Sequence, residues 1–292
     1  ICGNRNSFSK TDHDATFMHM KEDYMRNGQL KHGYNVNVAT CSDFIIGSYI
    51  SSDRNDVHTL IPFMEQLQKN YEGKNIGSVV VDSGYESEEN YCWFEAHPET
   101  ELYVKPSNHE AAKHRKYRTD ISRRENMAYN AQTDTYTCAN GKLLQKTQEK
   151  KTHTASGLEI TTSVYECSEC DGCPLKEKCI RACGSKKPLE ERYKVIYVSK
   201  RFARQRQAME AKISSPKGCL LRVNRSIQAE GNFAYVKQDL DFRRFLLRGS
   251  TKVAAEWLLF SLALNILHLH HKIQNRRLGS GLKIPSSFPA GL

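Results

Sequence analysis

The sequence predicts a mixed α/β fold in which helices cover a sheet, interrupted by a cysteine-rich insertion. In the first hundred residues, short β-branched or alternating segments are interleaved with segments of helical spacing. Their order is strand, strand, helix, strand, helix, strand, which is typical of a sheet with helices on its faces. Apolar periodicity then fades, and it returns as helical character near residue 200. We therefore expect a core of residues 1–105 and 201–277 around an insertion at 106–200, with a loose tail at 278–292.

The first elements follow from side-chain periodicity. Residues 33–39 alternate apolar and polar side chains, as a half-buried strand does, and residues 43–50 are predicted to be the hairpin partner. Residues 56–69 place apolar side chains at helical spacing. Before these segments, residues 15–25 have helix-like character.

A second group of elements leads to an acidic residue. The β-branched run 76–81 predicts a strand, and Asp82 follows it directly, ahead of a glycine turn. Residues 86–94 are predicted to be helical, and 102–104 form another short strand that Pro106 stops. Asp82 is therefore expected at the carboxyl end of a strand.

The last third is predicted to be helical. A basic helix starts near Ser199, a second helix covers residues 226–237, and the most hydrophobic helix covers about 252–269. The stretch 257–271 has no formal charge but contains Ser, Asn and His, and a bilayer span needs about 20 mostly apolar residues. We therefore expect the third helix to be buried inside the protein.

Composition narrows the class of protein. The 292 residues contain 43 Lys and Arg against 33 Asp and Glu, a net charge of +10, with 39% hydrophobic residues. This excludes an integral membrane protein and favours an anionic partner, while the 11 Phe, 14 Tyr and 2 Trp argue against a disordered tail. The chain starts at Ile1, and no basic and apolar leader follows, so we expect no signal peptide and a missing N-terminal segment.

The cysteines point to a metal site in the insertion. Ten are present, and five fall within seventeen residues. Cys167, Cys170, Cys173 and Cys179 have the spacing C-x2-C-x2-C-x5-C, in which thiolates two residues apart reach one metal from a tight turn. Structural zinc is the first interpretation. An iron–sulfur cluster and a set of unliganded thiols are the alternatives.

Two acids are candidates for chemistry. Asp82, at the carboxyl end of a strand, is placed where open α/β sheets bind ligands, and its oxygens suit Mg²⁺. The alternative is a capping or turn aspartate. Glu230 and Lys237 are seven residues apart, so in an α-helix they share a face and suit a metal site that also holds a phosphate. The alternative is an ordinary solvated face.

These motifs together resemble a known family. Asp82-Ser-Gly-Tyr85 after a β-branched run resembles the second-aspartate motif of DDE transposases from bacterial insertion sequences. Arg225-Ser-Ile-Gln-Ala-Glu230-Gly, with Lys237 seven residues on, resembles their glutamate motif. One subgroup, which also carries a cysteine-rich segment between aspartate and glutamate, has motifs similar to residues 11–15, 33–35 and 55–56.

The resemblance implies a fold and an activity. The fold would be RNase H-like, with the insertion between the second and third acids. Asp82 and Glu230 would be catalytic and would hold Mg²⁺ or Mn²⁺, while Lys237 and Arg225 would contact DNA phosphate. The substrate would be transposon-end and target DNA, cleaved and joined by a homo-oligomer in the bacterial cytoplasm at the nucleoid, without a membrane.

The resemblance also selects zinc ligands. The set would be Cys138, Cys170, Cys173 and Cys179, and Cys167 would be supernumerary. A structural Zn²⁺ in such a closed four-thiolate site would stabilise the insertion and would take no part in hydrolysis.

The sequence departs from the family pattern at two points. The position expected to hold Tyr holds Val223, and the position expected to hold Arg holds Ser226, with Arg225 one residue away. The first aspartate of the triad, which ends a strand upstream of residues 11–15 in the family, is not evident. Asp12 and Asp14 follow no apolar run, so we do not assign them to catalysis.

The missing acid defines the alternative function. We expect this polypeptide to be a truncated transposase with two of the three catalytic carboxylates, and to be inactive by itself. The alternative is an inactive remnant that acts only as a zinc-stabilised DNA-binding module.

Overall fold

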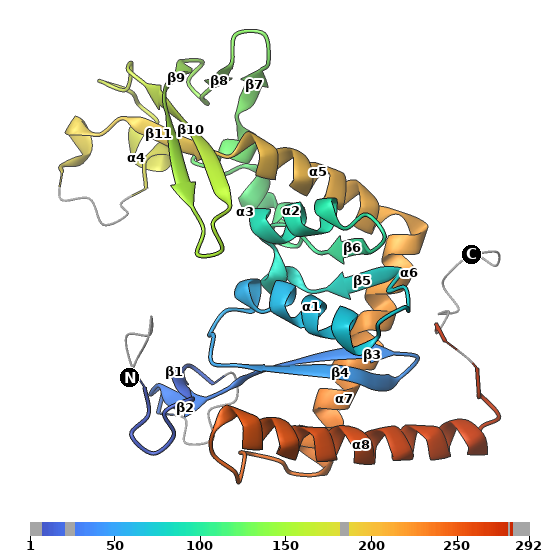
Figure 1. Cartoon of the computed structure of the whole chain (residues 1–292). Helices are drawn as coiled ribbons and strands as arrows, with labels where there is room; N and C mark the ends of the chain where they lie inside the picture. The colour runs from blue at the N-terminus through green and yellow to red at the C-terminus, as the bar shows by residue number, and fades with distance from the viewer. Residues whose placement is uncertain (1–7, 21–26, 182–186, 280, 283–292) are drawn as a thin grey trace. The chain divides into compact units, whose positions relative to one another are not determined.

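A computed structural model gives the fold of residues 8–20, 27–181, 187–279 and 281–282 (Figure 1). The chain forms two compact units. Unit 1 combines residues 1–105 with 211–292, and unit 2 is residues 106–210. Both helices and strands are present, so the predicted mixed α/β fold is confirmed.

The elements of unit 1 come from both ends of the chain. The strands are β1 (Thr16–Met18), β2 (Lys31–Gly33), β3 (Asn35–Cys41), β4 (Phe44–Ser51), β5 (Ser78–Val81) and β6 (Glu101–Val104). The α-helices are α1 (Leu60–Asn70), α2 (Glu88–Ala96), α6 (Pro216–Arg225), α7 (Gly231–Ala234) and α8 (Ser250–Gln274). Shorter turns are the 3-10 turns η1 (Asp56–His58) and η2 (Ser83–Tyr85) and the π-helical turns η6 (Ser226–Glu230) and η7 (Tyr235–Asp239).

The strands of unit 1 pair two by two. β3 and β4 form an antiparallel hairpin with Val36 opposite Ile50, and β5 and β6 are parallel with Val79 opposite Leu102. The predicted hairpin, the strand before Asp82 and the strand before Pro106 are therefore confirmed, as are the two helices between them.

The predicted helix at residues 15–25 is wrong over the part that the structure describes. Thr16–Met18 is instead the strand β1, which pairs antiparallel with β2. Ala15 and Thr16 are buried, so a tertiary pairing has overridden a weak local helical preference. Residues 21–26 lie outside the described part of the chain.

One face of α8 packs on β4. Trp257 and Leu264 of α8 share a core cluster with Ile45 of β4. Asn265 accepts from the Ile45 amide and donates to its carbonyl, both at 2.8 Å. Lys272 forms a largely buried ion pair with Asp43 at 3.3 Å. The helix is thus joined to the hairpin by polar as well as apolar contacts.

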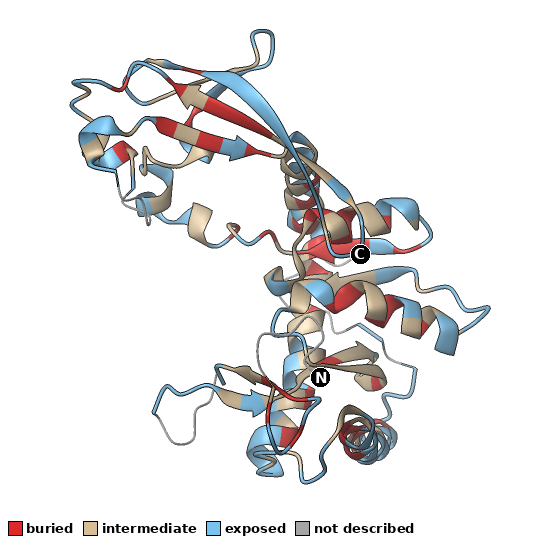
Figure 2. Ribbon diagram, turned by 60° about the vertical axis from the view of Figure 1, so that its left-hand side comes forward, coloured by how far each residue is buried: buried red, intermediate tan, exposed pale blue. Residues whose placement is uncertain are grey.

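The other face of α8 is exposed, so the prediction of a buried helix is wrong for that face. Figure 2 shows buried and exposed residues together along the helix. By length and composition alone, α8 is apolar enough to cross a membrane, and 28% of its most apolar window is buried. One such helix is weak evidence for a span. The exposed apolar residues are Leu258, Leu259, Leu262, Ile266, Leu269 and Ile273.

Unit 2 is built around an antiparallel sheet. The strands are β7 (Ala128–Asn130), β8 (Thr135–Thr137), β9 (Leu143–His153), β10 (Glu159–Cys167) and β11 (Lys194–Val198), in the order β11-β10-β9-β8-β7. The helices are α3 (Arg115–Arg118) and α4 (Lys176–Cys179), and α5 (Lys200–Ser214) begins in this unit. Short 3-10 turns are η3 (Ala111–Lys113), η4 (Arg124–Asn126) and η5 (Leu189–Glu191).

The core of unit 2 lies along β10 and β11. Leu144, Tyr165, Ile196 and Val198 are buried there together with Cys167 and Cys170. β9 is exposed almost throughout, and Figure 2 shows it beside the partly buried β10. The cysteine segment therefore joins directly onto the hydrophobic core of this unit.

The predicted tail at 278–292 lies mostly outside the described part of the chain. Of these residues, the structure describes 278, 279, 281 and 282.

Candidate active site

Asp82 lies where the sequence predicts it, at the carboxyl end of a parallel strand. It follows β5 directly and caps the turn η2, accepting a hydrogen bond from the Gly84 amide at 2.8 Å. Only one carboxylate oxygen, Oδ1, is used in this cap. The second oxygen, Oδ2, takes no part in the cap and accepts a hydrogen bond from another element of unit 1.

Arg225 brings the two predicted acids together. Its Nη2 donates to Asp82 Oδ2 at 3.1 Å, and its Nη1 donates to Glu230 Oε1 at 3.2 Å. The side chains of Asp82 and Glu230 are 38% and 66% exposed, whereas Arg225 is 25% exposed. A single guanidinium therefore holds two solvent-accessible carboxylates that are far apart in the sequence.

A π-helical turn explains why Arg225 reaches Glu230. The turn η6 covers Ser226–Glu230, between α6 and α7. In a π turn, hydrogen bonds join residues five apart, whereas an α-helix joins residues four apart. Residues 225 and 230 are thus aligned in the way that residues four apart are aligned in an α-helix. The π turn therefore compensates for the position of Arg225, which is one residue away from the position expected from the family that the sequence resembles.

Lys237 lies in the second π-helical turn, η7. Its side chain is exposed, and the described residues give it no ion-pair or hydrogen-bond partner. The prediction that Lys237 and Glu230 share a helix face assumed a regular α-helix. Residues 235–237, however, lie in a π-helical turn, in which the positions of the side chains around the axis differ. The assignment of Lys237 to DNA phosphate stays a prediction.

Asp56 is a third acid at the site, which the sequence reasoning did not assign to chemistry. Its Oδ1 accepts from Asn35 Nδ2 at 2.7 Å. A Cβ added to Gly84 would meet Asp56 Oδ2 and Asp82 Oδ1, each at 3.0 Å, so both carboxylates crowd this glycine. The only available signal was the Asn55-Asp56 dipeptide, which carried part of the family resemblance.

Tyr85 is a buried tyrosine whose pKa is affected by the carboxylates of this region. Its hydroxyl donates to Asn37 Oδ1 at 2.5 Å. Burial raises the pKa of Tyr85 well above its ordinary value, Asp56 and Asp82 raise it further, and Arg225 opposes the shift. The tyrosine therefore stays protonated and supports the end of β5 through a hydrogen bond.

Asp12 and Asp14, which were not assigned to catalysis, hold the start of α8. Asp12 Oδ2 accepts from the Tyr34 hydroxyl at 2.8 Å and from the Gly249 amide at 3.2 Å. Asp14 Oδ2 accepts from the Ser250 amide at 2.8 Å and its hydroxyl at 2.9 Å. Carboxylates at a helix N-terminus are stabilising, so this motif has a structural role.

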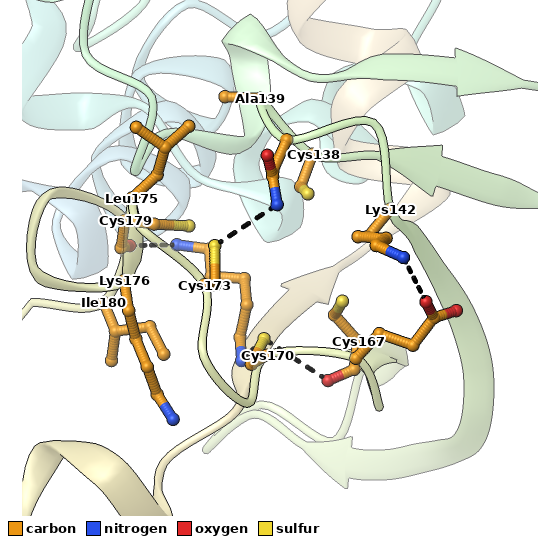
Figure 3. A pocket seen from close by; sticks show the side chains of 13 residues that line it. Cys138, Ala139, Lys142, Cys167, Cys170, Cys173, Leu175, Lys176, Cys179 and Ile180 are labelled. Carbon is orange, nitrogen blue, oxygen red and sulfur yellow. Dashed lines mark hydrogen bonds and ion pairs between the residues drawn. The ribbon is translucent and has the colours of Figure 1, made fainter.

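Unit 2 contains a separate cysteine pocket. A cavity of about 20 Å³ is lined by Cys138, Cys167, Cys170, Cys173 and Cys179 (Figure 3). Cys138 follows β8, Cys170 and Cys173 lie on the loop after β10, and Cys179 ends α4. The four cysteines that the resemblance selects thus converge on one cavity from three segments. Cys183 lies outside the described residues.

The pocket offers sulfur atoms with N–H donors beside them. The Lys194 amide donates to Cys170 Sγ at 3.4 Å, and Asn140 Nδ2 donates to Cys173 Sγ at 3.6 Å. Burial raises the pKa of Cys179, and the nearby thiols of Cys138, Cys170 and Cys173 raise it further, while Lys194 opposes the shift. As the cysteines lie, no group of three or more His, Cys, Asp or Glu side chains among the described residues has an arrangement that could hold a metal.

Comparison with known proteins gives one similarity, to a protein family. Residues 137–270 match the family model described as the transposase DDE domain. The matched range includes the cysteine pocket from Cys138 onward and extends through Arg225 and Glu230, while Asp82 precedes it. No curated protein and no solved structure matches the chain. Over residues 137–270, the chain is therefore similar to the DDE domain of transposases.

Proposed function

We propose that this chain supplies the catalytic region of a bacterial insertion-sequence transposase, which cleaves and joins DNA at transposon ends with the help of a divalent metal. The observation that carries the proposal is the Arg225 fork, which draws Asp82 and Glu230 to one point. Two acids that precede and follow a cysteine-rich insertion meet in unit 1, as an RNase H-like core with an inserted subdomain requires. The protein would work in the cytoplasm as a homo-oligomer on paired DNA ends.

Asp82 and Glu230 are the residues that would hold Mg²⁺ or Mn²⁺. Their chemistry fits, because hard cations prefer carboxylate oxygens and both side chains are accessible to solvent. The metal, when bound, would activate water and then a 3′-hydroxyl for attack on a phosphodiester. Arg225 neutralises the two acids in its absence, and it is placed to turn to a DNA phosphate when they are otherwise engaged. Lys237 would add a second phosphate contact.

Cys138, Cys170, Cys173 and Cys179 would hold a structural Zn²⁺. The fit rests on an all-sulfur donor set around one cavity, with N–H donors to two of the sulfurs. Binding requires the four thiols to move closer together than they lie in the described structure. Cys167, on the last position of β10, would remain part of the hydrophobic core.

A second function, DNA binding without cleavage, is favoured by a specific observation. Among the described residues, β5 pairs only with β6, so no strand carries a first aspartate beside Asp82. With two carboxylates of a triad, the 292-residue polypeptide is expected to bind DNA and to leave it uncut. The positive charge of unit 2 would supply that binding.

Metal-directed cleavage of the polypeptide tests the proposal without relying on activity. Fe²⁺ bound in place of Mg²⁺, with ascorbate and peroxide, is expected to cut the backbone near residues 82 and 230, and added Mg²⁺ to suppress the cuts. Asp82→Asn should abolish them. Glu72→Gln, which removes an exposed acid elsewhere in unit 1, should not. Cuts that persist in Asp82→Asn would overturn the assignment.

A nicking assay on supercoiled DNA separates the two functions. We expect the 292-residue polypeptide to bind DNA with an affinity that falls steeply with salt, and to show no Mg²⁺-dependent nicking. Nicking that disappears in Asp82→Asn would show that the acids present are sufficient. In that case Asp56→Asn is the next variant to assay, because Asp56 is the third carboxylate beside Gly84.

A further inference from the structure

The segment from the end of η3 through α3 in unit 2 carries a row of exposed cations. Lys113, His114, Arg115, Lys116 and Arg118 are all exposed. The acids nearest to Arg115, Lys116 and Arg118 in sequence are already paired with different cations. Glu110 pairs with Lys113, Asp120 with Arg123 and Arg181, and Glu125 with Arg124.

Three of these cations have no partner. Within the part of the chain that the structure describes, the side chains of Arg115, Lys116 and Arg118 make no ion pair and no hydrogen bond. We refer to these three residues as the unpaired patch. Elsewhere in unit 2 several lysines do have a carboxylate partner, as in the pairs Lys142–Glu169, Lys146–Glu149, Lys151–Glu159 and Lys200–Asp134.

The backbone under the unpaired patch is well fixed. Asn126 Nδ2 donates to the carbonyls of Tyr117 and Asp120 at 2.7 and 2.9 Å. The Arg123 guanidinium lies 4.0 Å from the centroid of the Tyr117 ring. Tyr117 thus packs against Arg123, whereas Lys116 and Arg118 on either side of it are exposed to solvent. The cations are presented from an ordered turn, which reduces the conformational entropy lost when they bind a ligand.

Spacing and charge together indicate the ligand. Arg115 and Arg118 are three apart in a helical turn, so they share a face, with Cβ atoms about 5–6 Å apart. A row of fixed positive charges without carboxylates attracts a row of negative charges, and the DNA backbone carries one phosphate per about 3.4 Å along each strand. Arginine forks also match phosphate oxygens in geometry.

We propose that Arg115, Lys116 and Arg118 bind the DNA backbone, as a phosphate-contacting surface separate from the acids of unit 1. The inference rests on the proposed function, because it takes DNA to be the partner. The contact carries no base information, since each of the three side chains would meet phosphate oxygens. Its contribution is to affinity and to salt dependence.

The test compares two triple variants of the full 292-residue chain that lose the same charge. R115Q/K116Q/R118Q removes the unpaired patch. K142Q/K146Q/K151Q, the matched control, removes three exposed lysines that each pair with a glutamate. Binding to a random-sequence DNA duplex is measured from 50 to 300 mM salt. For the patch variant we expect the slope of log affinity against log salt to fall by about 2–3, at about 0.9 per lost phosphate contact.

The control and a conservative variant decide between explanations. The control should change the slope by less than about 1, and R115K/R118K, which keeps the charge, should bind nearly as the parent does. Equal slopes for the two triple variants would overturn the inference while leaving DNA binding intact. A parent chain that binds no DNA would overturn the proposed function itself, together with this surface. Circular dichroism should show all variants folded, since the substituted side chains are exposed.

Discussion

Unit 1 and unit 2 differ in how they carry charge. Unit 1 has 22 Lys and Arg against 20 Asp and Glu, a net charge of +2, whereas unit 2 has 21 against 13, a net charge of +8. The acids proposed for chemistry are all in unit 1, and the unpaired patch and the cysteine pocket are in unit 2. Under the proposed function, this difference would correspond to a division of labour, in which unit 1 would act on the reacting phosphate and unit 2 would supply most of the non-specific attraction to DNA.

Zinc loss is expected to have the largest effect, and only on unit 2. Purified protein should contain about one zinc per chain, and Cys173→Ser should lose it. Because structural zinc supplies folding free energy of about 10 kcal/mol or more in small domains, hydrogen exchange should then lose protection within residues 106–210 and keep it in unit 1. Metal analysis and exchange measured by mass spectrometry check both points.

The cysteine variants also separate ligands from core residues. Cys41→Ser, an exposed thiol of unit 1, should keep the zinc. Cys167→Ser should keep it too, at some cost in stability, because Cys167 is buried in the core. An intact unit 2 without zinc would leave the cysteines as ordinary thiols and would contradict the proposed site.

Arg225→Gln is expected to strengthen metal binding in unit 1. The guanidinium lies 3.1 and 3.2 Å from the two carboxylates and competes with a divalent cation for them. Removing it should raise Mn²⁺ affinity roughly tenfold, which is about 1.4 kcal/mol and well below the unscreened Coulomb energy. Mn²⁺ titration followed by electron paramagnetic resonance measures the change.

A control for this variant comes from another cation of unit 1. Lys217 pairs with Glu101 at 2.8 Å and contacts neither Asp82 nor Glu230. Lys217→Gln should therefore leave Mn²⁺ affinity nearly unchanged. Unchanged or weaker affinity in Arg225→Gln would mean that the two acids do not form a metal site.

Asp134→Asn is expected to have the smallest effect, a loss of about 1 kcal/mol of stability in unit 2. The Lys200 ammonium, with the hydroxyls of Tyr165 and Tyr129, lowers the pKa of Asp134 to about 2. A carboxylate with a lowered pKa stabilises the fold above its unfolded pKa of about 3.9 and loses that effect as the pH falls through about 2. The difference from the parent should thus be full at pH 7 and shrink below about pH 4.

Urea unfolding at pH 7 and at pH 3 measures this difference. Glu191→Gln, which removes an exposed carboxylate of the same unit, is the control and should change stability by less than about 0.5 kcal/mol at either pH. A loss in Asp134→Asn that is equal at both pH values would show that the pair with Lys200 contributes nothing through charge.

The sequence predicted the elements around Asp82 well, because they repeat simple periods. The alternation in β3, the β-branched run of β5 and the helical spacing of α1 are local signals that agree with the final packing. Asp82 was found because a short apolar strand ended in an acid and a glycine turn. A metal site had also been predicted at the cysteine cluster, from spacing alone.

The remainder depended on contacts that no local pattern contains. β1 is a strand because Thr16 pairs with Gly33, and nothing in residues 15–25 encodes that partner. The exposed face of α8 was missed because composition gives the hydrophobicity of a helix but not the number of elements that cover it. Asp56 was missed because its proximity to Asp82 arises only when η1 and η2 meet.

The π-helical turn at Ser226–Glu230 has a consequence for how this chain is aligned with related sequences. A π turn is an α-helical turn that contains one extra residue, and η7 places a second one a few residues later. A single-codon insertion can therefore be accommodated inside this helix without rotating its two ends relative to each other. An alignment that forbids gaps within helices would place Ser226 opposite the arginine of related chains, and the guanidinium that serves both acids would be overlooked.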